Sequence, residues 1–93
     1  MVLTGKEKRA LRAQGNKLKV EIWIGKEGIS QGTVQTIENS FQTKELIKLK
    51  VLDTCPIPKE EVAERLASLT SSQVIQILGN TILFYRPFPE AED

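Results

Sequence analysis

A chain of 93 residues with 40% apolar and 27% charged residues has the composition of one soluble globular domain, with no room for a second hydrophobic core. It contains no histidine and one cysteine, Cys55, which excludes disulfides within the chain, Cys/His zinc sites and nucleophiles activated by histidine. We therefore expect no catalytic residue, no metal site and no cofactor.

The formal net charge of +1 conceals two halves of opposite sign. Residues 1–50 carry ten Lys/Arg against five acids, whereas residues 51–93 carry three against seven. A protein of this kind can bind a polyanion on its basic side. Alternatively, the two halves meet and neutralise each other, and the charges alone do not decide between these arrangements.

The sequence has neither a run of 18 apolar residues nor an apolar segment in its first residues, "MVLTGKEKRALR". We therefore expect no membrane span and no secretion signal, and a location in the cytoplasm.

The first predicted element is a helix that begins after Thr4, because Thr4 and Glu7 have the spacing of a capping box. It should run to about Gln14. Gly15 and Asn16 should then end it, with the left-handed backbone that glycine permits.

Residues 19–24, "KVEIWI", alternate between apolar and other side chains and predict a strand. Ile22 and Ile24 should face the core, which places Trp23 on the opposite side. We expect the first helix to cover Trp23. The alternative is that Trp23 forms a stacking platform for bases.

The next two elements are a helix and a strand. Ser30 is a good N-cap, and Val34, Ile37 and Phe41 repeat at the spacing of a helix of about three turns. Residues 46–52, "LIKLKVL", alternate and predict a strand.

The last third of the chain predicts one helix and two strands. Pro58 suits the first turn of the helix, with Val62, Leu66 and Leu69 as its apolar stripe. Residues 73–78 and 81–86 predict strands joined at Gly79-Asn80, a two-residue hairpin.

The resulting order is α-β-α-β-α-β-β, which predicts a single α+β domain with a four-stranded mixed sheet. The domain should span residues 1–87, followed by a flexible acidic tail at 88–93. The predicted core consists of Ile22, Ile24, Val34, Ile37, Phe41, Ile47, Leu49, Val51, Leu66, Leu69, Ile75, Ile77, Ile82 and Phe84.

The segment "IGKEGIS" places a G-x-x-G loop, residues 25–28, between a strand and the start of a helix. It does not match a nucleotide-binding P-loop, but it matches the clamp by which KH-type domains hold a nucleic-acid backbone. The following helix has no acid in its first turn, so its N–H groups and dipole favour an anion. A plain structural turn is the alternative, and Glu27 opposes phosphate binding unless it turns away.

Other cations could widen a basic surface around this loop. A solvated face is the ordinary explanation for any one of them, but together they suit phosphate contacts. The candidate RNA-binding residues are Gly25, Lys26, Glu27, Gly28, Lys8, Arg9, Arg12, Lys17, Lys19, Lys48 and Lys50.

Four segments resemble, in order and spacing, the YhbY-like CRM domain proteins (chloroplast RNA splicing and ribosome maturation). They are "LTGKEKRALRAQGNKLK", "IGKEGIS", "ELIKLKV" and "ILGNTILFYRP", and the match runs from about Val2 to Pro87. The resemblance implies a fold similar to the C-terminal domain of translation initiation factor three. It also implies a stand-alone RNA-binding protein associated with precursors of the large ribosomal subunit, whose G-x-x-G loop maps onto residues 25–28.

We interpret the chain as a non-catalytic RNA-binding protein that contacts precursor large-subunit ribosomal RNA and acts in ribosome assembly. The alternative is a protein-interaction adaptor whose basic half binds acidic ribosomal or assembly-factor surfaces. Salt-dependent binding to naked RNA would favour the first, and binding only to intact particles would favour the second.

Overall fold

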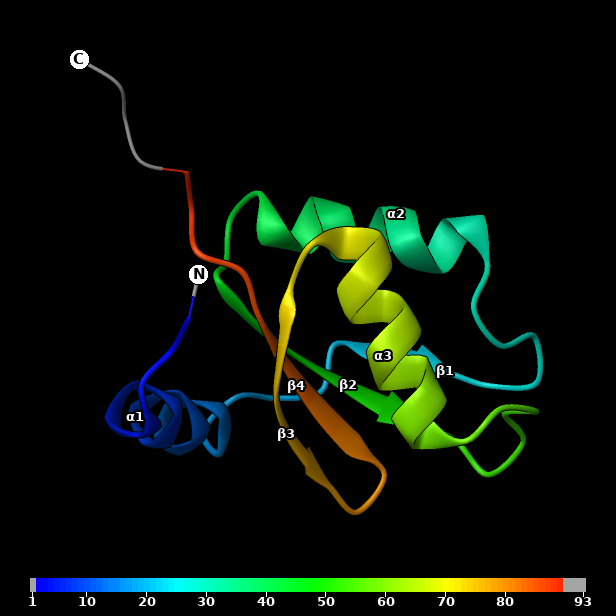
Figure 1. The fold of residues 1–93 in the computed structure, drawn as a ribbon. Helices are drawn as coiled ribbons and strands as arrows, with labels where there is room; N and C mark the ends of the chain where they lie inside the picture. Colours follow the sequence, from blue (N-terminus) through cyan, green and yellow to red (C-terminus); the bar gives the residue numbers. More distant parts are fainter. Residues whose placement is uncertain (1, 90–93) are drawn as a thin grey trace.

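The computed structural model describes residues 2–89. Within that range the chain forms the predicted α-β-α-β-α-β-β order and α+β class (Figure 1). The elements are α1 (Gly5–Gly15), β1 (Ile22–Ile24), α2 (Gln31–Phe41), β2 (Leu46–Val51), α3 (Lys59–Thr70), β3 (Gln73–Leu78) and β4 (Thr81–Tyr85).

The four strands form one mixed sheet in the order β1-β2-β4-β3. β1 pairs parallel to β2 through the α2 crossover, while β4 pairs antiparallel to both β2 and β3. The predicted hairpin joins β3 to β4, and Gly79 takes a φ of +59° there. The mixed sheet expected from the sequence is therefore confirmed.

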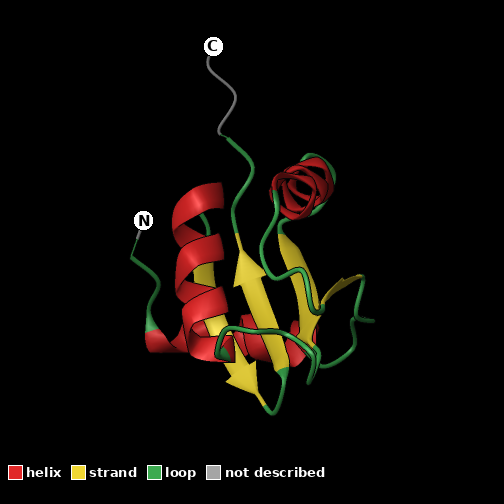
Figure 2. Cartoon of the chain, turned by 90° about the vertical axis from the view of Figure 1, so that its right-hand side faces the viewer, coloured by secondary structure: helices red, strands yellow, loops and turns green. Residues whose placement is uncertain are grey.

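The main core lies between the sheet and the helices α2 and α3. Figure 2 shows α3 lying along the sheet and α2 viewed end-on. Side chains of one parity from the strands point into this core, together with one face of each helix. Its buried members are Ile22, Ile24, Ile37, Phe41, Ile47, Leu49, Val51, Val62, Ala63, Leu66, Ile82 and Phe84.

The other face of the sheet is covered only in part, by α1. Leu3 packs there with Ile75 and Leu83 in a small second cluster, which Leu11 joins from α1. Figure 1 shows α1 on the other side of the sheet from α2 and α3. Residues 5–10 of α1 are all exposed, so this helix is held by few contacts.

The predicted core is largely confirmed, with one error in α3. Leu69 is 57% exposed, whereas Thr70 is buried at 1%. Thr70 can occupy the buried position because its hydroxyl donates to the carbonyl of Leu66 at 2.6 Å. Val34 and Ile77 are only partly buried, although both pack against the main core.

The predicted strand at 19–24 is too long at its start, because β1 begins at Ile22. Residues 16–20 cross from the end of α1 to the sheet edge, and a bond from Leu18 N–H to Gly15 O bends the chain there. The expectation that the first helix covers Trp23 is also wrong. Trp23 is 56% exposed, because α1 packs over β2, β3 and β4 instead.

The prediction of a left-handed end to α1 is wrong as well. Asn16 is right-handed at φ −62°, and Gly15 is not among the residues with positive φ. Glycine is needed at position 15 for space, since a Cβ there would collide with the Leu83 side chain. The close approach of α1 to β4 depends on this missing side chain.

The predicted tail at 88–93 falls mostly outside the described residues. Of its described part, Phe88 is exposed and its N–H donates to Glu45 Oε2 at 2.6 Å. Residues 90–93 lie outside the range that the structure describes, and the flexible tail stays a prediction.

Replacing Phe41 with alanine should lower the free energy of unfolding by about 3–5 kcal/mol. Phe41 is 2% exposed, and the Arg86 guanidinium lies 4.7 Å from its ring centroid. The exposed Leu69 is the matched control, and Leu69→Ala should change stability by less than about 0.5 kcal/mol. Urea unfolding of both variants measures this, and equal losses would contradict the assigned core.

A second prediction concerns the capping box of α1. The backbone N–H and the hydroxyl of Thr4 hydrogen-bond with Glu7 and lower the pKa of its carboxyl group. A lowered folded-state pKa stabilises the protein above the unfolded value, and this stabilisation is lost as pH falls through the folded value. The variant Glu7→Gln keeps a hydrogen-bond acceptor but not the charge. Its stability deficit at neutral pH should therefore shrink in acid, as thermal unfolding across pH would measure, whereas a pH-independent deficit would contradict this account.

Candidate nucleic-acid interface

The G-x-x-G segment forms a tight turn directly after β1. The carbonyl of Gly25 accepts from the N–H of Gly28 at 3.0 Å, which leaves Lys26 and Glu27 exposed at the tip. Neither tip side chain has a hydrogen-bond or ion-pair partner among residues 2–89. The turn therefore presents one free ammonium and one free carboxylate to solvent.

The two glycines have different roles in this turn. Gly28 has φ +64°, a conformation that side chains rarely adopt, and it is buried close to Pro56. Gly25 has no positive φ, and a Cβ there would lie at an ordinary 3.5 Å from Thr54 Oγ1. The loop that follows β2 thus supports the turn from behind, and only Gly28 is required by backbone conformation.

The start of α2 lies two residues beyond the turn. Ser30 caps the helix by accepting from the N–H of Thr33 at 3.2 Å, and Thr33 Oγ1 accepts from the N–H of Ser30. No acid occurs in this first turn, whereas α3 carries Glu60 and Glu61 in its own. The predicted absence of an acid from the first turn of α2 is confirmed, although one of the α2 N–H groups is already bonded within the cap.

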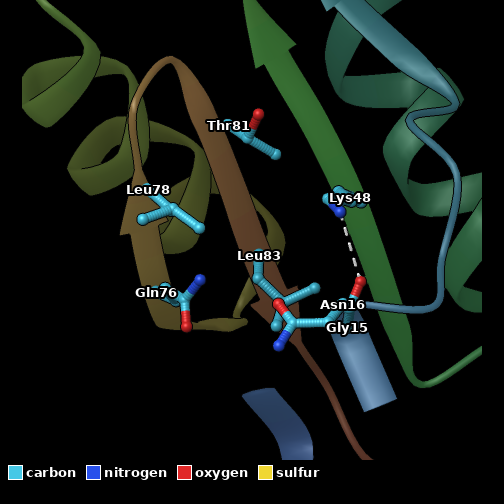
Figure 3. Close-up of a pocket in the computed structure, with 7 residues that line it drawn as sticks. All are labelled: Gly15, Asn16, Lys48, Gln76, Leu78, Thr81 and Leu83. Carbon is cyan, nitrogen blue, oxygen red and sulfur yellow. Dashed lines mark hydrogen bonds between the residues drawn. The ribbon is translucent and has the colours of Figure 1, made fainter. Parts of the chain in front are cut away.

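The candidate cations differ in how far the protein itself uses them. Lys48 donates from Nζ to the carbonyl of Gly15 at 3.3 Å (Figure 3). It also donates to the carbonyl of Leu18 at 3.3 Å. These bonds hold the C-terminal end of α1 against β2, as a cation at a helix C-terminus does. Within residues 2–89, no hydrogen bond or ion pair is made by the side chains of Lys8, Arg9, Arg12, Lys17, Lys19, Lys26 or Lys50.

The cations that do form ion pairs are others. Lys44 pairs with Glu21, Arg65 with Glu61, and Arg86 with Glu38. Arg86 also donates to the carbonyl of Thr70 at 2.9 Å and so links the ends of α2 and α3 to the end of β4. The acids of these pairs neutralise none of the candidate cations.

The structure divides the candidate residues between two regions. Figure 1 shows α1, which carries Lys8, Arg9 and Arg12, on the opposite side of the molecule from the turn at 25–28. Lys50 lies between these regions, because its β2 position pairs with Trp23 two residues before the turn. Trp23 is not among the candidate residues, because the sequence favours its burial under the first helix over a stacking role; its exposure in the structure makes it a candidate.

Comparison with known proteins identifies the family to which this chain belongs. Residues 3–86 match the model of the CRS1/YhbY (CRM) domain. The chain belongs to the CRM domain family. It is 38% identical over 89 residues to the "Probable RNA-binding protein YqeI" of Bacillus subtilis, covering 96% of this chain and 93% of that one.

Two further similarities extend the comparison. The "Probable RNA-binding protein MJ0652" of Methanocaldococcus jannaschii is 37% identical over 87 residues, which cover 91% of this chain and 64% of that protein. The solution structure of the hypothetical protein SAV1595 from Staphylococcus aureus superposes with a TM-score of 0.80 at 36% identity, covering 98% of this chain and 95% of that one. The α+β fold is therefore shared with that protein.

Two negative observations apply to the part of the chain that the structure describes. Among residues 2–89, no group of three or more His, Cys, Asp or Glu side chains is placed to hold a metal ion. None of the helices in the same range has the length and apolar character that a membrane crossing needs.

Substituting the two glycines separately should distinguish their roles. Gly28→Ala should lower the free energy of unfolding by roughly 1–2 kcal/mol, because alanine is strained in a left-handed conformation. Gly25→Ala should leave stability nearly unchanged, since its Cβ has room. Thermal unfolding of both variants tests this. A stable Gly28→Ala variant would show that the turn tolerates other conformations.

Proposed function

We propose that this protein is a non-catalytic RNA-binding protein that contacts RNA mainly through backbone phosphates. The observation that carries the proposal is the exposed turn with an unpaired Lys26 at its tip, set beside a helix start that has no acid. Free ammonium groups and helix N–H groups both attract phosphate. Membership of the CRM family and the names of its relatives support the same class of ligand.

We infer that precursor large-subunit ribosomal RNA is the ligand and that the protein acts in ribosome assembly in the cytoplasm. The resemblance of the motifs to YhbY-like proteins supports this choice. In the proposed complex Gly25 and Gly28 form the turn, Lys26 contacts a phosphate, and Glu27 points away from it. The remaining cations widen the basic surface, while Lys48 contributes chiefly by holding α1 in place.

Replacing Lys26 with alanine should weaken binding to ribosomal RNA fragments about equally across sequences. The slope of log K against log salt concentration should flatten by roughly 0.7–0.9 for one lost phosphate contact. Although the Glu27 side chain points away from the phosphate in the proposed complex, Glu27→Gln should tighten binding slightly, because it removes a negative charge from the tip of the same turn. Salt titrations of binding affinity measure both effects.

The matched control is Arg65→Ala. It removes the same charge from α3, where Arg65 is already paired with Glu61 at 3.0 Å and contributes little to stability. Its affinity and salt slope should resemble those of the wild type. An unchanged slope in Lys26→Ala would mean that the turn is only structural. Binding to intact particles with no affinity for naked RNA would instead favour a protein-interaction adaptor.

A further inference from the structure

Trp23 is the unusual residue of the sheet, because a side chain of this size normally buries most of its surface. It is 56% exposed although its neighbours Ile22 and Ile24 are buried at 7% and 1%. The strand alternation places those two against α2 and α3 and leaves Trp23 on the face that α1 occupies. Since α1 packs elsewhere on that face, more than half of the Trp23 surface stays exposed to solvent.

Trp23 belongs to a row of four residues that crosses the uncovered end of this face. Trp23 pairs with Lys50 on β2, Lys50 with Thr81 on β4, and Thr81 with Leu78 on β3. Strands are about 4.8 Å apart, so the row spans roughly 14 Å. Leu78 at the far end is 64% exposed, so both ends of the row present apolar surface to solvent.

The row itself carries a single charge, the ammonium group of Lys50. None of the four strands contains an acidic residue, and the Lys50 side chain has no hydrogen-bond or ion-pair partner among residues 2–89. The nearest acid along the chain, Glu21, is held away by hydrogen bonds to Ser40 Oγ at 2.9 Å and Lys44 Nζ at 3.1 Å. An anionic ligand with aromatic parts complements an indole beside free ammonium groups.

Unused hydrogen-bonding groups lie beside the row. A small pocket between α1 and the sheet is floored by Leu83 and bordered by Asn16, Gln76 and Thr81 (Figure 3). Within the described residues these three polar side chains have no hydrogen-bond partner. They can donate to and accept from the edge of a base.

The row also lies between the two parts of the proposed RNA surface. The turn at 25–28 begins two residues after Trp23, about 7 Å along the chain. On the other side, Lys48 and the end of α1 lead toward Arg12. Trp23 and Lys50 therefore lie between the two regions that the proposed RNA contacts.

We propose that the RNA ligand is unpaired where it crosses the sheet, with a base stacked on Trp23 and a neighbouring phosphate on Lys50. This inference rests on the proposed RNA-binding function and adds a second contact surface to it. Paired bases are already stacked within a helix, so only single-stranded nucleotides can use such a platform.

The chain has one tryptophan, so its fluorescence reports on position 23 alone when it is excited at wavelengths that Tyr85 does not absorb. The test is a titration of the wild-type protein with single-stranded oligouridylate and with an abasic RNA of the same length and phosphate count. Stacking predicts that the uridylate quenches the fluorescence strongly and that the abasic strand does not. Equal quenching by both strands would overturn the proposal.

Affinities of substituted proteins give an independent measure. Trp23→Ala should weaken oligouridylate binding by roughly 5- to 140-fold, the range for one base–aromatic stack. Leu69→Ala removes an equally exposed apolar side chain from α3 and should bind like the wild type. Trp23→Phe should keep most of the affinity, which guards against a folding defect in the alanine variant. Lys50→Ala should flatten the salt slope by roughly 0.7.

The outcomes separate this inference from the proposed function. If Lys26→Ala loses affinity and Trp23→Ala does not, RNA binding stands and the stacking surface is wrong. If a wild-type dimer dissociates in Trp23→Ala while RNA affinity is unchanged, the row is a contact between copies of the chain, and the inference is again overturned. Failure of the wild type to bind any naked RNA would refute both.

Discussion

The alternation of side chains along β2 and β4 is the constraint on which the rest of the structure depends. Ile47, Leu49, Ile82 and Phe84 are each no more than 1% exposed, and all four point toward α2 and α3. A strand turns successive side chains to opposite faces, so this burial fixes the direction of every residue between them. The lysines of β2 are thereby placed on the face that only α1 can cover.

The position of α1 decides which part of that second face remains accessible. It approaches the sheet closely at Gly15, where the missing side chain makes room for Leu83, and Lys48 bonds its last carbonyls. Its cluster with Leu3 and Ile75 lies toward the other end of the sheet from the turn. One row of the sheet is consequently left uncovered next to the turn at 25–28.

Charged side chains on the two sides of the sheet differ in whether they have partners. The acids of α2 and of the segment before β1 are bound to Arg86 and Lys44, and α3 neutralises its own N-terminus with Glu60 and Glu61. The candidate cations of α1 and of the turn lack such partners among the described residues. These side chains are therefore available for the phosphate contacts proposed above.

The sequence by itself determined the element order, the mixed sheet, nearly all of the core and the position of the turn, because each depends on local periodicity, capping or glycine placement. It could not determine that Thr70 rather than Leu69 is buried, since this depends on a hydrogen bond to Leu66 that apolar periodicity does not register. The sequence suggests that position 15 needs glycine for its backbone conformation. The structure shows that it needs glycine for space, because Leu83, 68 positions further along the chain, packs against it. The exposure of Trp23 was likewise decided only by tertiary packing. Strand parity selects a face of the sheet, but the place where a lightly held helix docks on that face depends on contacts distant in sequence.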